Sequence, residues 1–202
     1  MSNEIDHIFY INLEHRTDRK QEIEKELSNF GLTYERFPAI PHIIGGVGCG
    51  TSHMETIKLA KKRGYKNVLI FEDDFEFIVS KKVFEENIEK LFSENINFDV
   101  CFLAYNLFES SIIEGTPFLR KVLSSQTASA YIVNSNFYDD LIDLYSYSVN
   151  MFERHDQHWI YSIDQSWKQI QPLTNWVCFE ERLGKQRASM SDNTCVFTDY
   201  GC

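Results

Sequence analysis

Short apolar runs alternate with amphipathic stretches along this chain, and that alternation predicts an α/β fold. Residues 7–13 are rich in β-branched and aromatic side chains, and residues 68–71 form an unbroken apolar run. Both patterns are typical of strands, the second of a strand buried on both faces. Ile23, Leu27 and Phe30 lie between them at helical spacing, so they predict one apolar face of a helix. A strand followed by a helix is the opening of a βαβ unit.

The same two patterns continue toward the carboxyl terminus. Further strands are expected near residues 32–40, 98–103, 118–122 and 129–133, and further helices near 84–92 and 135–144. The sequence contains no repeat, low-complexity segment or obvious linker, and its 202 residues suit one α/β domain of ordinary size. We therefore expect a single domain over residues 1–202.

A glycine-dense stretch, residues 44–50, holds four of the nine glycines in the chain and predicts a loop. Ser52 and Glu55 follow with capping-box spacing, so a helix is expected to begin at Ser52 and to stop at Gly64. A glycine-rich loop before a helix can hold an anion. Because no Walker or dinucleotide-binding pattern is present, the alternative, a tight connecting loop, is favoured.

Composition limits the classes of function. Hydrophobic residues make up 43% and charged residues 25% of the chain, as in a globular protein. The formal net charge of −10 argues against nucleic acid and against an anionic membrane as partners. No apolar run approaches the ~20 residues of a transmembrane helix, and the first residues lack a signal-peptide core. The five cysteines form no Cys-x-x-Cys pair, so the sequence indicates neither a zinc site nor a disulfide framework, and we expect a reducing, cytoplasmic compartment.

Three carboxylates, Glu72, Asp73 and Asp74, directly follow the apolar run at residues 68–71. In an open α/β sheet the ligand crevice lies at the carboxyl ends of the strands, where these acids would sit. Adjacent acids repel one another, and a hard cation such as Mg²⁺ or Mn²⁺ would offset that repulsion through oxygen ligands. With a nucleotide diphosphate present, the cation would bridge carboxylate and phosphate. The alternative is a solvated acidic turn.

Other polar residues are also candidates for chemistry. Asp164 lies close to the aromatic Trp167, where it could serve as a general base or could stabilise a helix amino terminus. His155 and His158 could face one metal ion, but a third ligand is not evident, so a surface pair is the better interpretation. The cations best placed by sequence to meet phosphate groups are Arg16, Arg19, Lys185 and Arg187, although each alone is more often a surface charge.

Six short motifs follow one another in order along nearly the whole chain. They are residues 11–13 with Arg16, Asp18 and Arg19, then residues 48–53, 71–74, 127–133, 163–165 and 186–192. The ordered set resembles the family-25 glycosyltransferases, which include lipooligosaccharide and collagen galactosyltransferases. The resemblance is strongest at residues 71–74, Phe-Glu-Asp-Asp, which are similar to a Glu-Asp-Asp version of the family's DxD-like metal motif.

The resemblance implies a GT-A fold, in which a Rossmann-like, mostly parallel central sheet is flanked by helices. It implies an inverting, metal-dependent hexosyltransferase that moves galactose or glucose from a UDP-sugar. Glu72 and Asp74 would bind Mn²⁺ or Mg²⁺, and Asp164, with Asp156 in reserve, would deprotonate the acceptor hydroxyl. The residues expected to bind the nucleotide sugar are Asn12, Leu13, Arg16, Arg19, Ser52, His53, Asp73, Gln186 and Arg187.

The acceptor implied by the resemblance is a hydroxyl group of a glycan, a lipooligosaccharide or a collagen-like protein. Two alternatives can share the sheet and the acidic site. A sugar nucleotidyltransferase would release pyrophosphate in place of UDP. A non-catalytic sugar-nucleotide-binding module would bind UDP without using Asp164.

Overall fold

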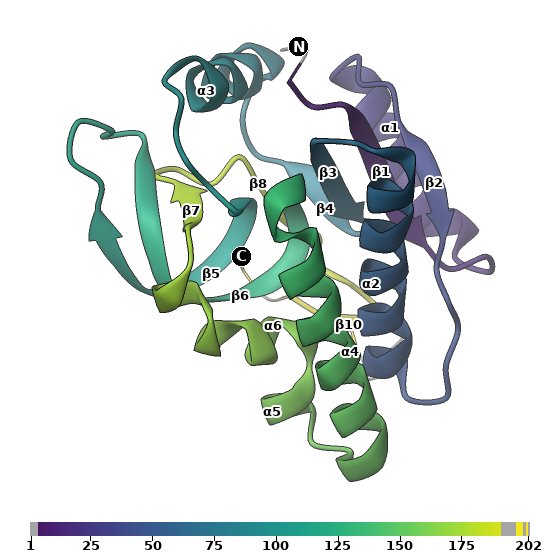
Figure 1. Ribbon diagram of the computed structural model, residues 1–202. Coiled ribbons are helices and arrows are strands. Elements are labelled where there is room, and N and C mark those ends of the chain that lie inside the picture. The colour runs from purple at the N-terminus through teal and green to yellow at the C-terminus, as the bar shows by residue number, and fades with distance from the viewer. Residues whose placement is uncertain (1–3, 191–196, 200, 202) are drawn as a thin grey trace.

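A six-stranded sheet forms the centre of the structure, a computed structural model that describes residues 4–190, 197–199 and 201 (Figure 1). In spatial order its strands are β2 (Glu35–Pro38), β1 (His7–Asn12), β3 (Asn67–Glu72), β6 (Leu119–Asn134), β5 (Val100–Ile112) and β7 (Trp176–Phe179). Strand β1 is parallel to β2 and β3, and β5 is parallel to β7, whereas β6 runs antiparallel to its neighbours. The predicted α/β class with a mostly parallel central sheet, as expected for a GT-A fold, is confirmed.

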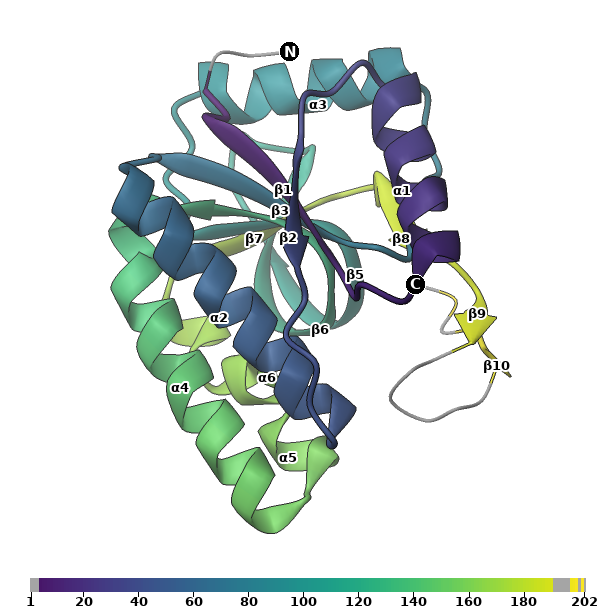
Figure 2. The ribbon, with the colours of Figure 1, turned by 90° about the vertical axis from the view of Figure 1, so that its right-hand side faces the viewer.

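Helices cover both faces of this sheet (Figure 2). Helices α1 (Thr17–Asn29) and α3 (Lys81–Ser93) pack on one face, and α2 (Gly45–Arg63) and α4 (Tyr138–His155) pack on the other. Successive strand residues point to opposite faces, so Ile8 and Tyr10 of β1 join the first core cluster, and Phe9 and Ile11 join the second. Burial on both faces explains why the strands read as continuous apolar runs. None of the helices in the described ranges is long and apolar enough to cross a membrane.

Short strands, short helices and 3₁₀ turns complete the fold. They are β4 (Phe75–Phe77), β8 (Gly184–Gln186), β9 (Ser189–Met190), β10 (Phe197–Thr198), α5 (His158–Tyr161), α6 (Ile163–Ser166) and the 3₁₀ turns η1 (Ser135–Phe137), η2 (Trp167–Gln169) and η3 (Gln171–Leu173). Strand β4 pairs antiparallel with β8. This pairing places the residues after β8 beside the acidic segment that follows β3.

The glycine-dense stretch is helical, so its prediction as a loop was wrong. Helix α2 begins at Gly45, and Ser52 lies in its interior, where its hydroxyl donates a hydrogen bond to the Gly48 carbonyl. A Cβ on Gly48 would lie 2.6 Å from the Ile40 carbonyl oxygen. A Cβ on Gly50 would lie 2.9 Å from Cγ2 of Ile163. The glycines therefore permit close packing of other segments against the helix.

The strands predicted at residues 118–122 and 129–133 join into the single strand β6, and β5 continues beyond the strand predicted at 98–103 as far as Ile112. In the sequence, the polar residues between the two predicted strands suggested an interruption of the strand. They pair with β5 through several register shifts, and the Ser125 carbonyl accepts a hydrogen bond from the Trp167 indole. Thr127 adopts a φ of 85°, a left-handed conformation that is costly for a β-branched residue.

Candidate functional site

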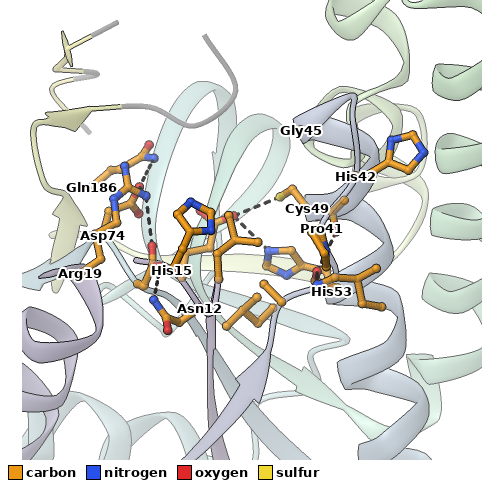
Figure 3. A pocket seen from close by; sticks show the side chains of 18 of the residues that line it. Asn12, His15, Arg19, Pro41, His42, Gly45, Cys49, His53, Asp74 and Gln186 are labelled. Atoms are coloured by element: carbon orange, nitrogen blue, oxygen red, sulfur yellow. Dashed lines mark hydrogen bonds and ion pairs between the residues drawn. The ribbon is translucent and has the colours of Figure 1, made fainter. Parts of the chain in front are cut away.

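A pocket of about 460 Å³ lies at the carboxyl ends of β1 and β3 (Figure 3). All the residues predicted to bind the nucleotide sugar line it except Arg16. Glu72 and Asp74, the predicted metal ligands, also line it. Asn12 ends β1 and Glu72 ends β3, so the parallel arrangement of the two strands brings these side chains to the same edge of the sheet. The structure thus gathers residues from distant motifs around one cavity, at the place where an open α/β sheet binds ligands.

A buried arginine bridges two of the three acids. Nη1 of Arg19 lies 3.1 Å from Oδ1 of Asp73 and 3.1 Å from Oδ2 of Asp74. Asn12 donates a further hydrogen bond of 2.7 Å from Nδ2 to Oδ2 of Asp73. Burial raises the pKa of Asp73, although the Asn12 hydrogen bond and the Arg19 charge oppose the rise. One guanidinium cannot balance two carboxylates, so this side of the pocket keeps an excess of negative charge when both acids are ionised.

One carboxylate oxygen of Asp74 has no hydrogen-bond partner among the described residues. Its Oδ2 accepts hydrogen bonds from Arg19 and, over 3.0 Å, from Nε2 of Gln186. Its Oδ1 is buried and has no hydrogen-bond partner within the described part of the chain. Burial and the charge of Glu72 raise the pKa of Asp74 to about 7. A buried oxygen without a partner is costly, and a hard cation takes oxygen ligands of this kind. Asp74 therefore fits a Mn²⁺ or Mg²⁺ ligand.

Glu72 faces a histidine and a cysteine from α2. Its Oε1 lies 3.1 Å from Nε2 of His53 and accepts a 3.4 Å hydrogen bond from the Cys49 thiol. Burial raises the pKa of Glu72, but the interactions with His53, the Cys49 hydrogen bond and the Arg19 charge together outweigh it, so the net shift of the pKa is downward. Nδ1 of His53 lies 2.8 Å from the Tyr131 hydroxyl, and Tyr145 donates a hydrogen bond to that hydroxyl. The histidine ring is fully buried.

Asp164 is held by α6 and by the strained part of β6. Its Oδ2 accepts a hydrogen bond of 3.3 Å from the Thr127 backbone N–H. Burial raises the pKa of Asp164, and the negative charge of Glu72 adds to the rise. Asp164 does not line the pocket itself, although its charge acts on the Cys49 thiol. The reserve candidate, Asp156, is exposed in a left-handed conformation at the end of α4.

The two histidines considered as a metal pair, His155 and His158, are both exposed, in agreement with the surface interpretation. The first ends α4 and the second begins α5.

Two known proteins named glycosyltransferase 25 family members are similar to this chain in sequence. A "Glycosyltransferase 25 family member" of Drosophila melanogaster is 24% identical over 87% of this chain. Another, of Drosophila pseudoobscura pseudoobscura, is 32% identical over 36% of the chain. The chain is a distant homologue of proteins named glycosyltransferase 25 family members. The matches cover 34% and 16% of the two relatives, so the chain spans about a third or less of their length.

Two further comparisons concern family models and solved structures. No protein-family model matches the chain. The crystal structure of A197 from STIV superposes with a TM-score of 0.50, at 10% sequence identity, over 96% of this chain and 99% of that one. At that identity the similarity shows a shared fold only.

All four predicted phosphate-binding cations pair with acids, Arg19 with Asp73 and Asp74 as described above. Arg16 forms hydrogen bonds of 3.1 and 2.9 Å with the Asp18 carboxylate. Arg187 lies 2.8 Å from Glu22 and 3.2 Å from Glu76, and Lys185 lies 3.2 Å from the same Glu76. An anionic diphosphate would therefore enter a pocket whose positive side chains are largely neutralised. This balance favours binding of the diphosphate together with a cation.

Sequence reasoning missed two residues of the site in this homologue. Cys49 was hidden within the presumed glycine loop, although its i, i+4 spacing from His53 would place both on one helix face once the helix is known. Tyr131 lies in β6 and reaches His53 across a separation of 78 residues. No local pattern marks that contact. The end of the last motif, Ser191 and Asp192, lies outside the described residues.

Proposed function

We propose that this chain is a metal-dependent, inverting glycosyltransferase that moves a hexose from a UDP-sugar to a hydroxyl acceptor. The observation that carries the proposal is the acidic pocket at the carboxyl ends of β1 and β3, with a buried Asp74 oxygen that no described residue contacts by a hydrogen bond. Its occurrence in a homologue of the glycosyltransferase 25 family supports sugar transfer. Galactose and glucose are the sugars that we propose, and a glycan, lipooligosaccharide or collagen-like hydroxyl is the acceptor.

Glu72 and Asp74 would hold Mn²⁺ or Mg²⁺ from the protein side. Within the described ranges, both hydrogen bonds to Glu72 go to Oε1, and Asp74 offers Oδ1. A bound divalent cation of this kind supplies positive charge to a leaving diphosphate, the main requirement when a sugar–phosphate bond breaks. Carboxylate oxygens match the preference of both cations.

The remaining pocket residues would position the donor. Asn12 and Arg19 fix the Asp73 carboxylate by hydrogen bonds of 2.7 and 3.1 Å, and we propose that Asp73 contacts hydroxyls of the ribose or of the donor sugar. Gln186 holds Asp74 in place from the β8 side. Such preorganisation matters because small displacements of a reacting group reduce the rate strongly.

Asp164 is the proposed general base. The acceptor oxygen loses its proton to the Asp164 carboxylate and forms a bond to the anomeric carbon, while the bond from that carbon to the diphosphate oxygen breaks and UDP leaves with the electron pair. A pKa raised by burial suits this role, because a base works best when its pKa approaches the working pH. The acceptor would approach from the α6 side. A single displacement of this kind uses no enzyme nucleophile.

The test is to incubate the protein with UDP-glucose or UDP-galactose, Mn²⁺ and a panel of hydroxyl acceptors, and to measure released UDP and released pyrophosphate separately. The proposal predicts UDP. Release of pyrophosphate, in a parallel reaction with sugar phosphate and UTP, would identify a nucleotidyltransferase, and UDP binding without either product would identify a non-catalytic module. Asp164→Asn should lower the transfer rate by about 10²–10⁴-fold, with UDP affinity unchanged. The exposed Asp156→Asn is the matched control and should keep the rate.

A further inference from the structure

Three side chains of different chemistry meet at one side of the pocket. The Cys49 thiol, the His53 imidazole and the Glu72 carboxylate each offer one ligand atom, and these atoms lie within 4.8 Å of one another. Cys49 and His53 are one helical turn apart on α2, so both face the end of β3. Figure 3 shows them on the side opposite Arg19, Asp74 and Gln186.

We propose that Cys49, His53 and Glu72 form a site for a divalent cation that prefers sulfur and nitrogen ligands, best matched by Zn²⁺. Zinc is bound in proteins by cysteine sulfur, histidine nitrogen and carboxylate oxygen, whereas Mg²⁺ and Mn²⁺ favour oxygen. The donor set therefore selects a different metal from the one proposed for Glu72 and Asp74. Glu72 would serve both sites, with Oε1, the oxygen that faces His53 and Cys49, on the zinc side. No sequence motif marks this site, because its ligands do not form a Cys-x-x-Cys pair.

The open geometry of the cluster suits an accessible zinc site. Three protein ligands leave the fourth tetrahedral position to water or to a bound molecule. All three residues line the pocket, so that position would face its interior. The surrounding charge also attracts a cation, because Asp164 and Asp74 both act electrostatically on the Cys49 thiol.

The contacts behind His53 match those of a metal-binding histidine. Metal-bound histidines usually use the second ring nitrogen to contact an oxygen, which fixes the orientation of the ring. Nδ1 of His53 contacts the Tyr131 hydroxyl at 2.8 Å, and the Tyr145 hydroxyl donates to that oxygen at 3.4 Å. These contacts hold Nε2 toward Glu72 and Cys49. In the metal-free protein the thiol proton points to Glu72, and binding of the cation to sulfur releases that proton.

This inference does not depend on sugar transfer, because its test measures metal binding alone. The full chain, reduced and stripped of metal, is titrated with Co²⁺ as a spectroscopic probe and then with Zn²⁺. A sulfur-to-cobalt charge-transfer absorption should appear and should disappear when Zn²⁺ displaces Co²⁺. Cys49→Ser should abolish the absorption and weaken Zn²⁺ binding by more than about 10-fold, and Tyr131→Phe should weaken it by about 10–100-fold as a partner of the metal-bound histidine.

Two matched controls separate this site from other thiols and histidines. Cys101→Ala changes a cysteine buried in the core, and His158→Ala changes an exposed histidine. Both should bind Co²⁺ and Zn²⁺ like the wild type. The proposal is overturned if the wild type gives no charge-transfer absorption, or if Cys49→Ser keeps it. Tyr131→Phe keeps the buried aromatic ring, so its effect on Zn²⁺ affinity tests the proposed site even where Cys49→Ser reduces stability.

Discussion

Replacement of Arg19 by methionine tests the charge balance of the pocket. The substitution keeps a long apolar side chain on α1 but removes the guanidinium that lies 3.1 Å from both Asp73 and Asp74. The side chains of all three residues are at most 10% exposed. Loss of one partner from a buried ion pair leaves an uncompensated charge and typically costs about 3–5 kcal/mol. We expect a decrease of that size in the free energy of unfolding of the metal-free protein.

The assay is urea denaturation near neutral pH in the presence of EDTA, followed by tryptophan fluorescence. Asp73→Asn in the Arg19→Met background should recover part of the loss, with a coupling energy of about 0.5–3 kcal/mol for groups in direct contact. Arg120→Met is the control, because Arg120 pairs with Glu180 at the surface and such pairs add little stability. The reasoning is refuted if Arg19→Met costs no more than Arg120→Met, or if the Asp73→Asn substitution gives no recovery.

Two further predictions concern stability. Hydrogen bonding to Arg63 lowers the pKa of Glu35 below its usual 4.5, so the pair stabilises the fold above that pH and this contribution disappears on acidification. The difference in melting temperature between wild type and Arg63→Gln should therefore shrink as the pH falls. A difference that stays constant with pH would contradict the assignment. Gly50→Ala would place a Cβ 2.9 Å from Cγ2 of Ile163. This crowding should lower the free energy of unfolding by about 1–3 kcal/mol, more than the ~1 kcal/mol gained in helix propensity. An increase in the urea midpoint would contradict the close packing of α6 on α2.

The sequence predicted the elements whose pattern repeats locally. The apolar run at residues 68–71 reads as a doubly buried strand because β3 has helices on both faces. Ile23 and Leu27, spaced by one helical turn, lie on the buried side of α1, as their spacing predicted. Gly64, in a left-handed conformation with φ of 72°, ends α2 as expected, because glycine adopts that conformation without strain. The position of the three acids at the ligand-binding edge of the sheet follows from the direction of β3 alone.

Contacts between distant segments could not be predicted in this way. Gln186 reaches Asp74 across 112 residues because β8 pairs with β4, a choice made by the topology. Arg19 was expected to meet phosphate. Its contact with the Asp73 carboxylate was not predicted, because 54 residues separate the two along the chain. Gly48 and Gly50 signalled a loop because their tight contacts with other segments are invisible along the chain. Local patterns thus located the pocket but left its internal pairings open.

The central claim is metal-dependent binding of a UDP-sugar at the acidic pocket. Calorimetric titration with UDP, UDP-glucose, UDP-galactose and GDP-mannose, first with Mn²⁺ and then with EDTA, tests it most directly. We predict binding that is selective for uridine and is lost with EDTA, and we predict that Asp74→Ala abolishes the metal dependence while its melting curve stays cooperative. Equal UDP affinity with Mn²⁺ and with EDTA in the wild type would contradict the metal assignment, and absence of binding to every nucleotide would contradict the proposed function.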